Sequence, residues 1–194
     1  MRFFIVVLML NVCLTAHGQG INKYLLKEVG WTIELPRGFE KMSLAADAAN
    51  NQKGKNAIES VINQPIDASG TRTLISATKN IHEYFNATIT AFNVKKDGSY
   101  YKSNVAVKKL IYNTFKAQMP QAVIDSATTI KLIGGLKFDK FQMKAFIDQK
   151  LLFTMVLCSK LYKGYDFGIS YLFIKSDTEN ELDAMFENSS FKVK

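Results

Sequence analysis

The sequence predicts an α+β fold: one domain built on an antiparallel β-sheet that is flanked by helices. The chain has 194 residues, of which 47% are hydrophobic and 12% aromatic, and this length and composition suit one globular domain. From residue 123 onward, segments that alternate apolar and polar residues follow one another, separated by turn residues. This is the pattern of an antiparallel meander. Helical spacing of apolar residues before and after the meander predicts the flanking helices.

The first eighteen residues are expected to be a signal peptide. Arg2 precedes the apolar run Phe3–Leu10, and the small residues Ala16 and Gly18 follow it. This order of charge, apolar run and small residues is typical of a secretory signal with a cleavage site. The run is shorter than the roughly 20 apolar residues that cross a membrane. We therefore expect residues 19–194 to form an exported domain, periplasmic or secreted, with no transmembrane segment.

A lipoprotein acylated at Cys13 is the alternative for this leader, but Asn11 and Val12 stand where small residues are wanted. If the leader is removed, Cys158 is the only cysteine left, so no intramolecular disulfide can form. Cys158 ends the apolar stretch 151–158. We expect a thiol in the core rather than a nucleophile, which would need a basic partner and partial exposure.

The first half of the chain predicts strands around a short helical region. A strand is expected from Gly30 to a turn at Pro36, and two more strands at 71–78 and 87–94. Between them, a short helix is expected at 43–49, a loop at 50–55 and a helical face at 57–62.

The clearest helix follows, ended by Pro120. Its expected apolar face consists of Val105, Val107, Leu110, Ile111, Thr114 and Phe115. The meander is expected as strands at 123–133, 137–146, 151–162 and 165–174. A final helix is expected from Ser176, with overlapping capping boxes that begin at Ser176 and Thr178. Phe191 is expected to return toward a sheet.

Three local patterns occur here in an order found in a known family. They are the strand and turn Trp31–Phe39, the amphipathic helix before the meander, and a closing helix that ends in Ser190-Phe191-Lys192. The arrangement resembles the PsbP/DcrB-like group over residues 24–194, although the Ala/Asn-rich stretch 43–64 departs from it. The resemblance implies an α/β/α sandwich and an accessory, mostly non-enzymatic role. It implies no catalytic residues.

The sequence offers little equipment for catalysis. Beyond the leader, His82 is the only histidine, so a catalytic triad or a histidine zinc site lacks partners. Gly134-Gly135 lacks the flanking pattern of a phosphate loop. No carboxylate cluster matches a calcium loop. We therefore expect no catalytic, cofactor or metal site. A hydrolase that uses carboxylates without histidine is kept as a third alternative.

The formal net charge of +8 points to an anionic partner. The candidate contact residues are Lys95, Lys96, Tyr100, Tyr101, Lys102, Lys108, Lys109 and Lys116. These residues would form a basic flank beside the long helix. The expected function is therefore an exported accessory or interaction module of the bacterial cell envelope, which docks to an envelope protein or an anionic surface. Nucleic acid is excluded by the export and by the lack of a stacking pattern. A solvated face that keeps the protein soluble is the simpler alternative.

Aromatic residues are dense late in the chain and suggest a second hypothesis. They are Phe138, Phe141, Phe146, Phe153, Tyr162, Tyr165, Phe167, Tyr171 and Phe173. A sheet that carries these rings beneath helices would enclose a pocket for a small hydrophobic molecule, which makes the protein a carrier. Core packing explains the same rings. Separately, Asp125-Ser126-Ala127 resembles the O-glycan acceptor of exported Bacteroidetes proteins.

Overall fold

The computed structural model describes residues 22–192, so the predicted signal peptide and Cys13 lie outside the described residues. The strands of the large sheet are β3 (Glu40–Lys41), β4 (Thr71–Asn80), β5 (Glu83–Ala91), β6 (Val123–Ile133), β7 (Leu136–Ile147), β8 (Lys150–Tyr162) and β9 (Tyr165–Phe173). The small sheet consists of β1 (Lys23–Leu26), β2 (Trp31–Glu34) and β10 (Ser190–Phe191). The helices are α1 (Leu44–Ile62), α2 (Val94–Asp97), α3 (Tyr100–Gln118) and α4 (Ser176–Asn188).

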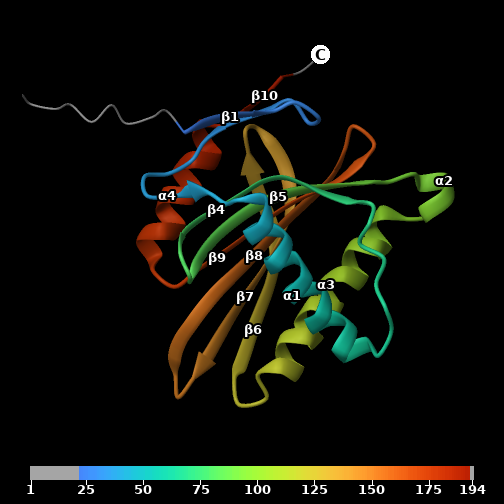
Figure 1. The fold of residues 1–194 in the computed structure, drawn as a ribbon, viewed down its shortest axis with the longest axis vertical. Helices are drawn as coiled ribbons and strands as arrows, with labels where there is room; N and C mark the ends of the chain where they lie inside the picture. The colour runs from blue at the N-terminus through green and yellow to red at the C-terminus, as the bar shows by residue number, and fades with distance from the viewer. Residues whose placement is uncertain (1–21, 193–194) are drawn as a thin grey trace, which may run out of the picture.

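Seven strands form the large sheet in the order β3-β4-β5-β9-β8-β7-β6, and every neighbouring pair is antiparallel. The helices α1 and α3 cross one face of the sheet (Figure 1). The helix α4 and the small sheet pack on the opposite face. The predicted α+β class with an antiparallel sheet flanked by helices is confirmed. None of the helices within residues 22–192 has the length and apolarity to cross a membrane.

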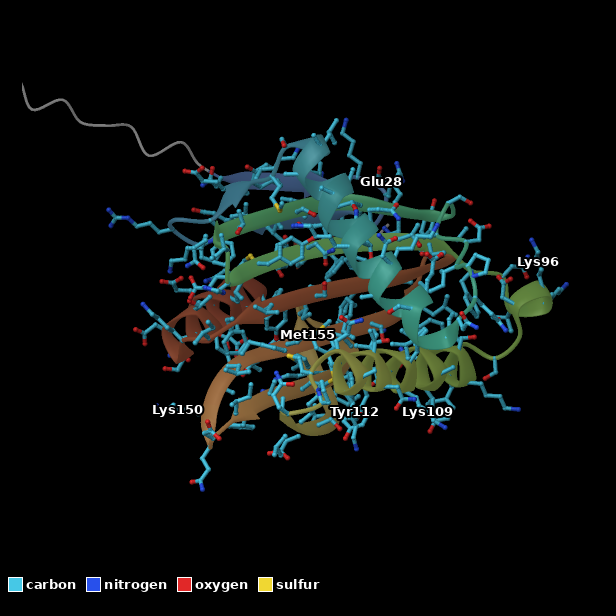
Figure 2. All side chains as sticks on the ribbon, turned by 60° about the horizontal axis from the view of Figure 1, so that its bottom comes forward. Glu28, Lys96, Lys109, Tyr112, Lys150 and Met155 are labelled. Atoms are coloured by element: carbon cyan, nitrogen blue, oxygen red, sulfur yellow. The ribbon has the colours of Figure 1, made fainter. Side chains whose placement is uncertain are left out.

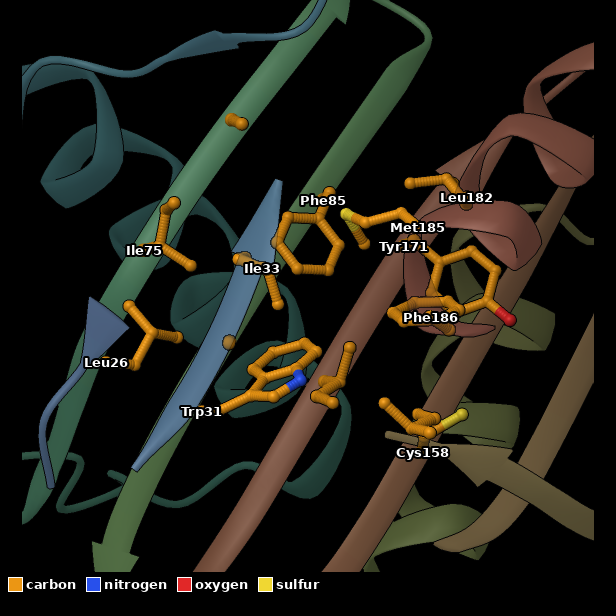
Figure 3. Packing of buried hydrophobic residues seen from close by; sticks show 14 of the residues in the cluster. Leu26, Trp31, Ile33, Ile75, Phe85, Cys158, Tyr171, Leu182, Met185 and Phe186 are labelled. Carbon is orange, nitrogen blue, oxygen red and sulfur yellow. The ribbon is translucent and has the colours of Figure 1, made fainter. Parts of the chain in front are cut away.

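One face of the large sheet, here called the α4 face, holds the main core. Alternate residues of β5, β7, β8 and β9 point into it and meet α4 and the small sheet. The fully buried Trp31 of β2 belongs to this core (Figure 3). Its ring stacks on Phe191 with the centroids 5.6 Å apart, and it is edge-on to Phe167 at 5.7 Å. Because successive side chains of a strand point to opposite faces, one face collects the large aromatic residues. The dense late aromatics thus serve largely as core.

The opposite face of the sheet, here called the α1/α3 face, is covered more loosely. It carries the intervening residues of the same strands, among them Asn86, Ser159, Asp166 and Ser170, which are half-buried. No residue of α1 is buried, and α3 buries only Asn104 and Thr114. Hydrogen bonds bridge this face, for example from Ser170 to Asn86 and from Asn104 to Ser159.

Three expectations about the helices are wrong. The predicted loop 50–55 lies inside α1, a continuous helix of 19 residues that Ser43 caps at its start and Asn63 ends in the left-handed conformation. The well-defined caps fix both ends, and the intervening polar residues are compatible with a solvated helix. Val105 and Val107 are not part of a buried face but are about half exposed, since α3 turns Asn104 toward the sheet.

The third error concerns the predicted capping boxes of the last helix. The N-cap of α4 is Lys175, and no side chain caps the helix. Thr178 is buried and its hydroxyl instead donates to Glu83 of β5 at 2.7 Å. A long-range contact has replaced the local one because α4 packs with its first turn against the sheet.

The turn between β6 and β7 was predicted correctly and fixes the strand register. Gly134 and Gly135 both have positive φ, 53° and 82°, as a two-residue hairpin turn requires. A Cβ on Gly134 would lie 2.9 Å from the ring of Phe191, so only glycine fits. Phe191 returns to a sheet as expected, and it pairs with Trp31 in the small one.

Candidate interaction site

The eight predicted contact residues are distributed over α2 and α3. Lys95 and Lys96 lie on the short α2, and the other six lie on α3. Figure 2 labels Lys96 on α2, away from the sheet, and Lys109 on α3. Lys102, Lys109 and Lys116 are seven residues apart and all exposed. Because seven residues are close to two helical turns, these lysines form one line along the helix. Three of the eight residues thus share one exposed side of α3.

Two of the eight residues are engaged inside the protein. The Tyr100 hydroxyl donates a hydrogen bond to Asp166 Oδ1 at 2.8 Å. The Lys108 ammonium forms an ion pair with Asp139 at 2.6 Å, and its side chain is only 13% exposed. Tyr100 and Lys108 are therefore held by the sheet rather than free on the surface.

A cleft of about 400 Å³ runs along the outer side of α3. Its helical wall consists of Tyr101, Val105, Lys108 and Tyr112, at spacings of four, three and four residues that place them on one stripe. Its floor comes from β6 and β7 and includes Phe141, Ser126 and Thr128. Tyr101 is 73% exposed and Val105 is 45% exposed.

Charge is distributed unevenly along the cleft. Asp139 neutralises the charge of Lys108. Lys109, which belongs to the line of exposed lysines, also lines the cleft and forms no ion pair within the described residues. Tyr112 and Lys109 are adjacent to each other on the same side of α3 (Figure 2). The cleft thus offers exposed aromatic and apolar surface next to unpaired positive charge, which suits a segment that carries both an apolar and an acidic side chain.

A second, polar pocket of about 300 Å³ lies between α3 and the sheet. Burial raises the pKa of the Asp166 carboxyl above its ordinary value, although its hydrogen bond from Tyr100 opposes this. Burial also raises the pKa of Tyr100, and the nearby Asp166 adds to the effect, so the phenol keeps its proton and remains the donor. Asn104 Oδ1 is buried and accepts no hydrogen bond from the described residues.

A third space, an apolar groove of about 390 Å³, separates α1 from α3. Ala57 and Ile58 of α1 face Ile111 and Phe115 of α3 across it, and Met155 of β8 forms part of its lining (Figure 2). The helix α1 contacts α3 and buries none of its own residues, so the space between the two helices stays open. Its volume is within the range of small-molecule sites.

The residues considered for catalysis are not assembled into a reactive group. Cys158 is buried on the α4 face, and burial raises the pKa of its thiol to about 12. His82 is exposed in the turn between β4 and β5. Within residues 22–192, no three His, Cys, Asp or Glu side chains are grouped so that they would hold a metal ion.

Sequence reasoning missed the residues that complete the cleft from the sheet side. Phe141 and Asp139 occupy alternate positions of β7, so they share a face that is opposite to that of Phe138. The alternation was visible in the sequence. Which helix would cover that face was not, because this depends on how α3 crosses the sheet.

Comparison with known proteins supports the fold. No protein-family model matches the sequence, and no curated protein matches it. The solution structure of cyanobacterial PsbP (CyanoP) from Synechocystis sp. PCC 6803 superposes with a TM-score of 0.55 at 10% identity, covering 90% of this chain and 96% of that one. A crystal structure from Bacteroides thetaiotaomicron VPI-5482 gives a TM-score of 0.46 at 10% identity, over 89% of this chain but only 49% of that one. The superposition on CyanoP shows that the chain has a PsbP-like α+β fold.

Proposed function

We propose that the protein is an exported, non-catalytic accessory module of the bacterial cell envelope, and that it docks an acidic segment of a partner protein in the cleft beside α3. The observation that carries this proposal is that the cleft wall, with its exposed Tyr101, lies beside a line of lysines that form no ion pair with any other residue in 22–192. Aromatic side chains such as Tyr101 are favoured as anchors in interfaces. Export is supported by the order of residues in the predicted leader.

The proposed docking surface has an apolar side and a positively charged side, both on α3. Tyr101, Val105 and Tyr112 form the apolar wall, and Lys102, Lys109 and Lys116 run alongside it. The lysines would steer an acidic partner and set its orientation, while the aromatic wall would contribute most of the contact area. Since the lysines are exposed, their attraction weakens as salt shortens the Debye length from about 10 Å at 0.1 M.

Site-specific photo-crosslinking in intact cells tests the proposal. A photoreactive phenylalanine analogue replaces Tyr101 in the wall of the cleft, and in a control strain it replaces Ile81, which is even more exposed, at 92%, and lies in the turn between β4 and β5. We expect a discrete crosslinked product from position 101 and none from position 81. The product should weaken when Lys102, Lys109 and Lys116 are changed to glutamate. Equal products from both positions, or none from position 101, would contradict the proposal.

The apolar groove favours a second candidate, a carrier of a small hydrophobic molecule. Its lining by Ala57, Ile58, Ile111 and Phe115 is what such a ligand requires. Native mass spectrometry of the protein purified gently from the envelope fraction should then show an adduct of a few hundred daltons. Ala57→Trp, which fills the groove, should abolish the adduct, and Ala49→Trp on the exposed side of α1 should not. A bare protein in every preparation argues against the carrier.

A further inference from the structure

The two edges of the large sheet are protected to very different degrees. One edge ends in β3, a strand of only two residues, Glu40 and Lys41, both of them charged. Its neighbour β4 has two register irregularities, after Thr73 and after Thr78. Short strands, charged residues and bulges are the devices that keep an edge from pairing with another chain.

The other edge, β6, is neither short nor bulged, and it carries only two charged residues, Asp125 and Lys131. It is 11 residues long and its register with β7 runs without a shift from Val123 to Ile133. It contains no proline. Within the described residues, no strand pairs with its outer side. Three of its large apolar side chains are exposed: Val123, Ile130 and Leu132. A long, regular and apolar edge of this kind is a template for pairing with another strand.

The hairpin turn decides which backbone groups are available at this edge. Ile133 and Leu136 flank the two-residue turn and form its hydrogen-bonded closing pair. Hydrogen-bonded and non-hydrogen-bonded pairs alternate along an antiparallel ladder, so the odd-numbered residues of β6 face β7. The N–H and C=O groups that point outward therefore belong to Ile124, Ser126, Thr128, Ile130 and Leu132.

The charges of β6 select a second copy of this chain as the partner. Asp125 and Lys131 are its only charged residues, and they lie three positions before and three positions after Thr128. We propose that β6 pairs with β6 of a second copy, antiparallel about a two-fold axis at Thr128, so that the two large sheets join into one. Each Asp125 then lies opposite a Lys131, and each Ile124 opposite a Leu132.

Neighbouring registers lose this complementarity. A shift by two residues places Asp125 opposite Thr129 or Ile133, so that Asp125 no longer faces a positive charge. A shift by one residue moves the outward N–H and C=O groups of the two strands out of alignment. Lys131 already forms an ion pair with Asp183 at 2.6 Å, but an ammonium has three N–H donors and can donate to a second carboxylate. The self-pairing does not rest on the proposed function. Thr128 also lines the cleft beside α3, so the clefts of two copies would meet at the axis.

Sedimentation velocity on the purified protein tests the inference. We expect a dimer whose fraction rises with concentration. Asp125→Lys places two positive side chains opposite each other and should weaken dimerisation at least tenfold, about 1.4 kcal/mol of association free energy. Glu187→Lys makes the same change in charge on the exposed end of α4 and should leave the dimer intact. Thr128→Pro should also yield monomers, because it removes an outward N–H and no bond of the β6–β7 ladder.

Three results would overturn the inference. The first is a monomer at every concentration up to about 1 mM, where even an association with a Kd of that size would be visible. The second is a dimer that survives Asp125→Lys, which would place the contact on another surface. The third is a series of larger oligomers, because pairing about a two-fold axis closes at two copies. Thermal unfolding of Asp125→Lys at a concentration where both proteins are monomeric should match that of the unchanged protein.

Discussion

The two faces of the large sheet are both covered by helices, but only one of them is sealed. On the α4 face, a helix of 13 residues buries four side chains, Thr178, Leu182, Met185 and Phe186. On the α1/α3 face, α1 has 19 residues and buries none. The sealed face also holds the stacked rings of Trp31 and Phe191. The loosely covered face holds the polar pocket and the apolar groove.

This contrast assigns the two faces different roles: the α4 face stabilises the fold, and the α1/α3 face is available for binding. Close packing of apolar side chains accounts for most of the free energy that holds a fold together. The α4 face therefore stabilises the domain, and losses there should be large. The α1/α3 face retains space, half-buried polar groups and exposed aromatic residues, which a partner or a ligand needs. Substitutions there should have small effects on folding.

Trp31→Ala should have the largest effect, because it removes the centre of the aromatic cluster on the α4 face. The side chain is fully buried and contacts Phe167, Phe186 and Phe191. We expect a loss of about 3–5 kcal/mol in the free energy of unfolding, measured by urea denaturation. Tyr101→Ala, in the wall of the cleft, should change it by no more than about 0.5 kcal/mol. Similar losses for the two variants would contradict the contrast.

Thr178→Val tests the buried link between α4 and β5. Glu83 is 4% exposed and accepts hydrogen bonds from Thr178 at 2.7 Å and from Asn80 at 2.8 Å. Removing the Thr178 hydroxyl leaves a buried carboxyl oxygen without its donor, which should cost about 1–3 kcal/mol by the same denaturation assay. Ser176→Ala should be nearly neutral, since Ser176 caps nothing. The reverse ranking would favour the local capping box that the sequence suggested.

Gly54→Ala should stabilise the protein slightly. Gly54 lies in the middle of α1, and a Cβ there would meet nothing within 4 Å. Alanine is favoured over glycine inside a helix by about 0.5–1 kcal/mol, so the unfolding midpoint should rise. Gly134→Ala is the counterpart on the sealed side and should destabilise, because its Cβ would collide with Phe191 at 2.9 Å. A destabilised Gly54→Ala would show that α1 packs more tightly than its exposure suggests.

Asp166→Asn should have the smallest effect and one that depends on pH. Burial raises the folded-state pKa of Asp166 above its ordinary value of 3.8, so the stability that its protonated form contributes is lost as pH rises through that folded-state pKa. Asparagine stays neutral and still accepts from Tyr100. The variant should therefore exceed the unchanged protein in stability at pH 7, and this gain should disappear near pH 3.

Asp139→Asn provides the opposite case on the same face. It removes the anion from Lys108, whose side chain is 13% exposed, and should lower the stability at pH 7. Denaturation of both variants at the two pH values checks the pair. A loss of stability in Asp166→Asn at pH 7 would show that its carboxylate is stabilising.

Much of the fold was predictable from local sequence. Alternation in 123–133, the Gly134-Gly135 turn and the apolar stretch that ends at Cys158 fixed the meander, because each strand shows its period of two and each turn its special backbone conformation. The middle of α1 was less predictable. Residues 50–55 contain no apolar side chain, and a solvated helix has no apolar period by which it can be recognised.

The candidate site was predictable only in part. Lys102, Lys109 and Lys116 could be assigned to an exposed basic flank from helical spacing alone. That Tyr101 is exposed while Tyr100 points inward could not be predicted, because Tyr100 donates to Asp166, which lies 66 residues away in the chain. Lys108 is likewise distinguished from Lys109 only by Asp139 on β7.

The sequence by itself determined the order of strands and helices, the apolar face of each strand, and the line of lysines on α3. These properties depend on periodicity and turn chemistry, which act over a few residues. Only the tertiary structure decided which face α4 covers, that α1 lies above a groove, and that no strand of residues 22–192 pairs with the outer side of β6. Those outcomes depend on contacts between residues that are distant in the chain, and such contacts form only when the sheet brings the elements together.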